Sequence, residues 1–197
     1  MADIDPNVQY HIRLAKGDVG RYVLLPGDPG RVPVIASFFD EAREVAFNRE
    51  FRTFTGTVGG IKVSCTSTGI GCPSTAIAVE ELVKVGADTF IRVGTGGSLQ
   101  REVGLGNLCI TTGAVREEGT TRQYVPLSYP AVADLDVTSA LRQAARKLGV
   151  SSASYDWLDN ADARAAATVA VLTGPKAFAA NEKVVIGVMG LGGRGTA

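Results

Sequence analysis

The amino-acid sequence predicts an α/β protein, a three-layer sandwich around a central mixed, mostly parallel sheet. Three observations predict this class. Short apolar runs alternate with amphipathic segments over the first 150 residues, three of these runs end in glycine-rich turns, and 197 residues suffice to bury one full hydrophobic core. Because ligands of such sheets bind beyond the carboxyl ends of the strands, we expect the glycine-rich turns to gather at that edge.

The first predicted elements are a strand, a turn and a helix. The apolar run 22–25 stops at Pro26-Gly27-Asp28-Pro29-Gly30, which is typical of a buried strand that runs into a tight turn. The apolar-rich segment 32–39 then predicts a helix.

A hairpin and a second helix follow. The β-rich runs 51–57 and 61–65 flank Gly59-Gly60, and this pattern predicts a β-hairpin. A second glycine-rich turn at 68–74 leads into a predicted helix at 74–85, whose apolar residues share adjoining faces.

Two more strands and one more helix complete the first 150 residues. A strand is expected at 89–93, where it runs into the third glycine-rich turn, and another at 108–112. The amphipathic segment 134–148 predicts a helix that is capped by Asp134 or Asp136 and closed by glycine.

The composition changes after Val150. We expect residues 1–150 to form the core and residues 151–197 to be a shortened or divergent C-terminal part of the same domain. The segment 183–195 has the pattern of a strand and glycine turn of a nucleotide-binding dehydrogenase. No helix or acidic residue follows it to hold a ribose, so we do not expect a functional NAD site.

Charge and cysteine content narrow the class of function. Twenty basic side chains balance twenty acidic ones, so no long-range field gathers nucleic acid or an anionic membrane, and a small-molecule substrate is expected. Cys65, Cys72 and Cys109 are too few and too irregularly spaced for a disulfide framework, and we expect buried thiols. With no signal peptide or membrane-spanning run, the sequence indicates a reduced, cytoplasmic setting.

Residues able to hold a phosphate stand beside the glycine-rich turns. Main-chain N–H groups in such turns bind anions, and arginine adds a planar fork of donors. Arg31 follows the first turn, and Arg92 interrupts the apolar strand before the third. A charge inside a strand is costly unless it is paired, yet an edge strand with Arg92 in water fits the spacing equally well. His11 is the only histidine, which excludes a histidine metal cluster.

Four motifs in order give the chain a resemblance to a known family. It closely resembles the nucleoside phosphorylase-I family from about Tyr10 to about Val150, and its segments 79–82 and 123–134 are more similar to the uridine branch than to the purine branch. The motifs that carry the resemblance are Leu25–Val32, Asn48–Phe51, Ser67–Ser74 and Phe90–Gln100.

The resemblance implies roles for individual residues. The implied phosphate ligands are Gly27, Arg31, Arg49, Arg92 and Thr95. The implied nucleoside ligands are His11, Thr95 and Gly96. The implied ligands of a monovalent cation, often potassium, are Glu50, Ile70 and Ser74. Arg49 and His11 would act in the site of a neighbouring subunit. Without the resemblance, His11 would be interpreted as a surface histidine near a loose terminus.

The resemblance also implies a reaction and an assembly. Phosphate, the co-substrate, would attack the anomeric carbon of uridine while the base leaves, and positioned arginines and amides suffice, with no covalent nucleophile or bound cofactor. The family forms symmetric dimers assembled into hexamers. We find no equivalent of its base-binding residues or of its Met-Glu ribose pair after Val150. An impaired or inactive phosphate-binding member therefore stays an alternative, as do a purine nucleoside phosphorylase and a nucleosidase.

Overall fold

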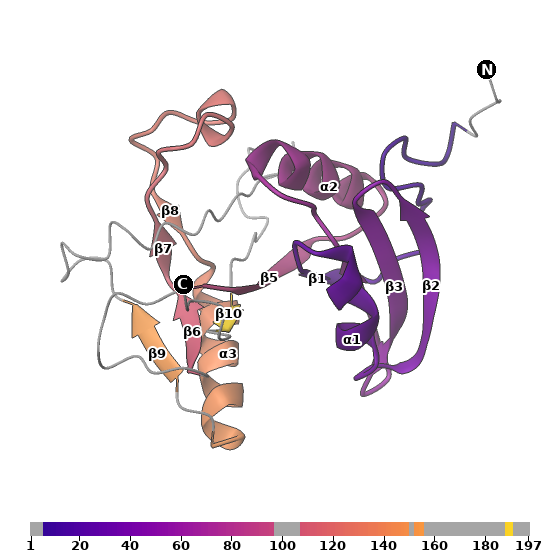
Figure 1. Cartoon of the computed structure of the whole chain (residues 1–197). Coiled ribbons are helices and arrows are strands. Elements are labelled where there is room, and N and C mark those ends of the chain that lie inside the picture. The colour runs from indigo at the N-terminus through magenta and orange to yellow at the C-terminus, as the bar shows by residue number, and fades with distance from the viewer. Residues whose placement is uncertain (1–5, 97–106, 150–151, 156–187, 191–197) are drawn as a thin grey trace, which may run out of the picture. The chain divides into compact units, whose positions relative to one another are not determined.

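The computed structural model describes residues 6–96, 107–149, 152–155 and 188–190 (Figure 1). The described residues form two compact units, one up to Ile91 and the other from Arg92 onward. Among the described residues, no helix is long and apolar enough to cross a membrane.

The first unit is built on four paired strands with the order β2-β3-β4-β1. The β2–β3 and β3–β4 pairs are antiparallel, whereas β4 and β1 are parallel. Helix α1 packs on β3 and β4. The elements are β1 (Tyr22–Leu25), the 3-10 helix η1 (Pro29–Arg31), α1 (Val32–Ala36), β2 (Asp40–Asn48), β3 (Phe51–Val58), β4 (Ile61–Thr66) and α2 (Cys72–Lys84).

The hairpin β3–β4 confirms the Gly-Gly signal of the sequence. Gly59 and Gly60 both have positive φ angles, 58° and 79°, as the tight two-residue turn between these strands requires. Strand β2 is absent from our sequence-based prediction. Its first five residues are exposed, so it lacks the alternating apolar pattern by which a half-buried strand is recognised. The predicted helix at 32–39 is correspondingly shorter and ends at Ala36.

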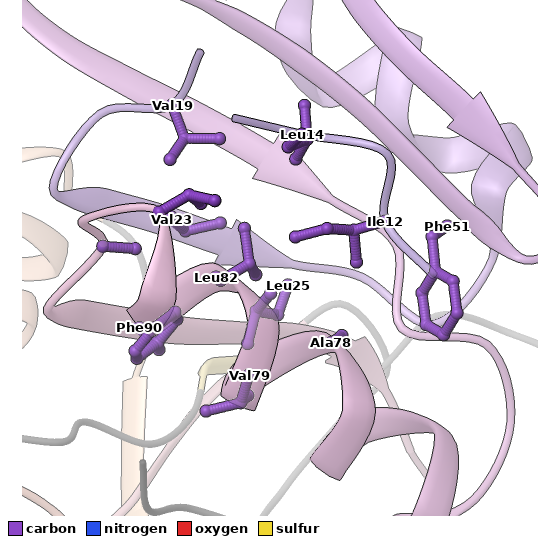
Figure 2. Packing of buried hydrophobic residues seen from close by; sticks show 12 residues of the cluster. Ile12, Leu14, Val19, Val23, Leu25, Phe51, Ala78, Val79, Leu82 and Phe90 are labelled. Carbon is purple, nitrogen blue, oxygen red and sulfur yellow. The ribbon is translucent and has the colours of Figure 1, made fainter. Parts of the chain in front are cut away.

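The core of the first unit lies between α2 and the strands. Figure 2 shows side chains of α2, such as Val79 and Leu82, among those of β1, such as Val23 and Leu25. Phe51 of β3 closes this cluster and is only 1% exposed. Burial of apolar area, worth about 25 cal/mol per Å², is thus concentrated beneath α2.

The second unit has the strand order β5-β10-β6-β9, and β5 begins in the first unit. Strand β10 is parallel to β5 and antiparallel to β6, while β6 and β9 are parallel. A small antiparallel pair, β7–β8, stands apart from this order. The elements are β5 (Thr89–Thr95), β6 (Leu108–Thr111), β7 (Gly113–Ala114), η2 (Thr121–Gln123), β8 (Ala131–Val132), α3 (Leu135–Lys147), β9 (Ser152–Tyr155) and β10 (Val188–Gly190).

Both ends of α3 have the capping residues that the sequence predicts. The Asp134 carboxylate accepts a hydrogen bond from the Val137 N–H at 3.0 Å, which selects Asp134 over Asp136 as the N-cap. Gly149 follows the helix with a φ of +64°, a conformation that glycine adopts readily. Helix α3 packs on β6 and β9.

The predicted fold class, a mixed α/β sheet with flanking helices, is confirmed. The division into residues 1–150 and 151–197 stays a prediction, and most of the second segment lies outside the described residues. Of the predicted buried thiols, Cys65 and Cys109 are buried, but Cys72 is half-buried. Burial raises the pKa of the Cys65 thiol to about 12, although the Arg31 guanidinium acts in the opposite direction.

The core assignment predicts unequal effects of two phenylalanine substitutions. We expect Phe51→Ala to lower the free energy of unfolding by about 3–5 kcal/mol, because it leaves a cavity in the core. Phe38→Ala, in the same unit but at a side chain that is 82% exposed, should change it by less than about 0.5 kcal/mol. Urea denaturation of both variants measures the difference, and equal losses would contradict this core.

Candidate functional site

Two of the three glycine-rich turns lie side by side in the first unit. The parallel strands β1 and β4 end close together, with Leu24 opposite Cys65. Beyond the strands, the Thr68 N–H donates to the Pro26 carbonyl at 2.9 Å, and the Gly69 N–H donates to the Gly27 carbonyl at 2.9 Å. These bonds join the turns at the carboxyl edge, as the sequence predicts for them. The third turn follows β5, and residues 97–106 lie outside the described residues.

The first turn fixes the position of Arg31. The Asp28 carboxylate accepts from the Gly30 N–H at 2.7 Å and caps η1, and the Arg31 N–H donates to the Asp28 carbonyl at 3.1 Å. Arg31 is half-buried, and its guanidinium makes no hydrogen bond or ion pair within the part of the chain that the structure describes. Its five N–H donors are therefore available to an anion.

Arg49 occupies the tight turn between β2 and β3. Asn48 pairs with Phe51, so that Arg49 and Glu50 alone form the turn. Arg49 has a φ of +55°, a left-handed conformation that costs a non-glycine residue about 1–3 kcal/mol. Its guanidinium lies 5.9 Å from the centre of the Tyr10 ring. Arg49 is exposed, so this strained turn presents a cation at the surface of the unit.

Glu50, from the same turn, meets the second glycine-rich turn. The Ser74 hydroxyl lies 2.9 Å from Glu50 Oε1 and 2.6 Å from the Thr68 carbonyl. Hydrogen bonds from the backbone N–H of Glu50 itself and from Ser74 lower the pKa of the Glu50 carboxyl, because both favour its charged form. Gly69 has a φ of +69°, and a Cβ there would lie 2.6 Å from Glu50 Cγ, so the contact requires glycine.

The residues predicted to hold a cation supply suitable oxygen ligands. Glu50 offers a carboxylate, Ser74 a hydroxyl and Ile70 its main-chain carbonyl, and hard cations prefer such ligands. The structure brings Glu50 and Ser74 together, while the Ile70 side chain, 98% exposed, lies in the connecting turn. No cluster of three or more His, Cys, Asp or Glu side chains suited to a metal ion occurs among the described residues.

His11 is held beside Arg49 in the first unit. Its Nδ1 lies 2.6 Å from Glu81 Oε1, and its ring meets the Tyr10 ring edge-on at 4.9 Å. The Asn48 side chain donates to the His11 carbonyl at 2.7 Å. His11 and Arg49 thus both contact the Tyr10 ring, and His11 also bonds to Asn48, the residue before Arg49. His11 is therefore not on a loose terminus.

The sequence did not lead us to predict a role for Glu81, although its position in the helix pattern indicated one. In the segment 74–85, Glu81 falls on the same face as Ala78, Leu82 and Val85, which are buried. Glu81 is itself 7% exposed. A charged residue in an apolar stripe is costly unless it is paired, so the pattern indicates a buried partner.

The second unit holds Arg92, Thr95 and Gly96. The half-buried Arg92 donates from Nη1 to the Val93 carbonyl at 2.9 Å. A Cβ at Gly94 would lie 3.6 Å from this Nη1, so the absent side chain leaves room beside the guanidinium. Thr95 is exposed at the end of β5. The convergence of Arg92 with Arg31 stays a prediction.

Comparison with known proteins identifies the family. The model of the phosphorylase superfamily matches residues 21–179. The chain belongs to this superfamily, which confirms the resemblance expected from its motifs.

The more specific similarity is to nucleoside phosphorylases. The chain is 62% identical over 146 residues to a uridine phosphorylase of Thermococcus kodakarensis, over 74% of this chain and 53% of the relative. It is 52% identical over 145 residues to a uridine phosphorylase of Treponema pallidum, over 74% of this chain and 56% of the relative. It is 47% identical over 137 residues to a guanosine phosphorylase of Halorubrum lacusprofundi, over 70% of this chain and 57% of the relative. The chain thus matches little more than half the length of these relatives.

Solved structures agree on the fold. A uridine phosphorylase from Vibrio fischeri superimposes with a TM-score of 0.80 and 29% identity, over 94% of this chain and 84% of that one. A purine nucleoside phosphorylase from Toxoplasma gondii, in complex with immucillin-H, superimposes with a TM-score of 0.78 and 30% identity, over 98% of this chain and 84% of that one.

The contact at Gly69 predicts a difference between two glycine variants. Gly59 and Gly69 both have positive φ, but a Cβ at Gly59 meets nothing within 4 Å. We expect Gly69→Ala to lower the free energy of unfolding by about 1–3 kcal/mol more than Gly59→Ala, because only the former also places a methyl group against Glu50 and Ser74. Urea denaturation measures both, and equal losses would refute the crowded geometry.

Proposed function

We propose that the chain catalyses the phosphorolysis of uridine. Inorganic phosphate forms a bond to the anomeric carbon of the ribose as the glycosidic C–N bond breaks, and the bonding electrons leave with uracil. The departing uracil takes up the proton that the phosphate loses. The products are ribose 1-phosphate and the free base, so the chain is a pentosyltransferase. Similarity to uridine phosphorylases supports this substrate, and the half-buried Arg31 beside the two joined glycine-rich turns is the structural observation that carries the proposal.

The phosphate needs positioning more than activation. Gly27, Arg31, Arg92 and Thr95 bind it in this proposal, and Arg49 reaches the phosphate of a neighbouring subunit. Guanidinium groups stabilise the charge that shifts during the reaction without reorganising. Arg31 suits this role because its donors meet no protein acceptor among the described residues.

The nucleoside and the assembly complete the proposal. His11 approaches the ribose of the neighbouring subunit, while Thr95 and Gly96 lie close to the nucleoside. Glu50, Ile70 and Ser74 hold a monovalent cation such as potassium. A site completed by a neighbour requires at least a dimer, and we propose a hexamer built from such dimers, acting in the cytoplasm. Phosphate is the co-substrate, and no bound cofactor takes part.

Uracil release, measured by chromatography with and without phosphate, tests the function. We expect uracil and ribose 1-phosphate to form from uridine only when phosphate is present. Release without phosphate would indicate a nucleosidase, and faster turnover of guanosine would indicate a purine phosphorylase. No release, with phosphate binding retained in calorimetry, would indicate an inactive phosphate binder.

Two arginine variants test the role of Arg31 in the same assay. We expect Arg31→Ala to raise the KM for phosphate about 10- to 100-fold, since a charged hydrogen bond is worth about 1.5–3 kcal/mol. Arg21→Ala is the matched control, because Arg21 is exposed and its side chain, among the residues that the structure describes, pairs only with Asp88 and the Tyr22 ring. Equal KM values for phosphate in the two variants would contradict a role of Arg31 in binding phosphate.

A further inference from the structure

Glu81 is a buried carboxylate that gathers the segment around His11. Its Oε2 accepts hydrogen bonds from the main-chain N–H of His11 at 3.0 Å and from the main-chain N–H of Ile12 at 2.9 Å. Its Oε1 lies 2.6 Å from His11 Nδ1. The Glu81 side chain is 10% exposed, compared with 31% for His11, so the pair is largely shielded from competing water.

These contacts determine which ring nitrogen carries the proton. An ionised carboxylate only accepts hydrogen bonds, so the short contact requires a proton on Nδ1. In the neutral ring, Nε2 then keeps its lone pair. Nε2 has no hydrogen-bond partner within the part of the chain that the structure describes. A neutral His11 therefore offers an acceptor to an incoming hydroxyl group.

Other contacts restrain the orientation of the ring. The Asn48 side chain holds the His11 carbonyl at 2.7 Å, and the Tyr10 ring meets the imidazole at an interplanar angle of 84°. Tyr10 in turn lies beneath the guanidinium groups of Arg13 and Arg49, at 5.4 and 5.9 Å from its centre. Helix α2, the β2–β3 turn and the N-terminal segment thus fix one imidazole between them.

We propose that Glu81 is a positioning residue, which holds His11 in the Nδ1–H form so that Nε2 accepts a hydrogen bond from a sugar hydroxyl. This inference rests on the proposed function, because it assigns the hydroxyl to the nucleoside. It adds a buried carboxylate on α2 to the residues that determine nucleoside binding. A purely structural role, in which Glu81 only satisfies two backbone N–H groups, is the reading to be distinguished from it.

Nitrogen NMR of the full-length chain tests the protonation state without any catalytic assay. His11 is the only histidine, so its two ring nitrogens give an unambiguous ¹⁵N signature. We expect the neutral wild-type ring to carry its proton on Nδ1. We expect Glu81→Gln to populate the Nε2–H form, because one amide oxygen cannot serve the three donors that two carboxylate oxygens serve. Glu80→Gln, the same change one residue earlier on α2, should leave the spectrum unchanged.

The spectra have outcomes that overturn the proposal. An Nε2–H ring in the wild type would do so even if Glu81→Gln fails to fold. An Nδ1–H ring that persists unchanged in Glu81→Gln would also do so. Neither result depends on turnover of uridine, so failure of this inference is distinguishable from failure of the proposed function.

A double-mutant cycle in the uridine assay tests the consequence for binding. We expect Glu81→Gln and His11→Ala each to raise the KM for uridine about tenfold, as the loss of one hydrogen bond does. The double variant should match His11→Ala alone, because Glu81 acts through His11. Additive losses would show that Glu81 acts independently of His11 and would overturn the proposal.

Discussion

The candidate site depends on the parallel pairing of β1 and β4. Two main-chain hydrogen bonds continue this pairing past the ends of the strands, from Thr68 to Pro26 and from Gly69 to Gly27. A side chain at position 69 would collide with Glu50, so glycine there is what lets the β2–β3 turn approach the second glycine-rich turn. Arg31 follows one of the two turns that these bonds join, and Glu50 contacts Ser74 at the end of the other. The site is therefore a property of the sheet edge, not of either loop alone.

The sequence predicted the elements whose signals are local. Gly59-Gly60 and the Asp134 cap specify a turn and a helix start through their own backbone or side-chain chemistry, and both lie where expected. Strand β2 escaped prediction because it is largely exposed, and an exposed strand needs no apolar alternation. Its pairing with β3 stabilises it instead, and that is a contact between segments rather than a pattern within one.

The candidate site divides in the same way. The family resemblance pointed to Glu50, Ser74, His11 and Arg49. Spacing along the chain could not show that Glu50 meets Ser74, or that His11 and Arg49 both meet Tyr10. Those contacts arise from the tight β2–β3 turn, which directs Glu50 toward Ser74 and sets Arg49 beside the Tyr10 ring. Glu81 carried a signal in the helix pattern, yet its partner became clear only from the folded chain.

The central claim, that the joined glycine-rich turns bind phosphate, has a direct test in backbone amide NMR during titration with inorganic phosphate. The account predicts saturable shifts at the amides of Gly27 and Arg31, because the anion binds next to them at the Arg31 guanidinium. The Gly59-Gly60 turn, which is also rich in glycine but has no such arginine, should not respond. Saturation without a shift at Gly27 and Arg31, or equal shifts at the two turns, would contradict it.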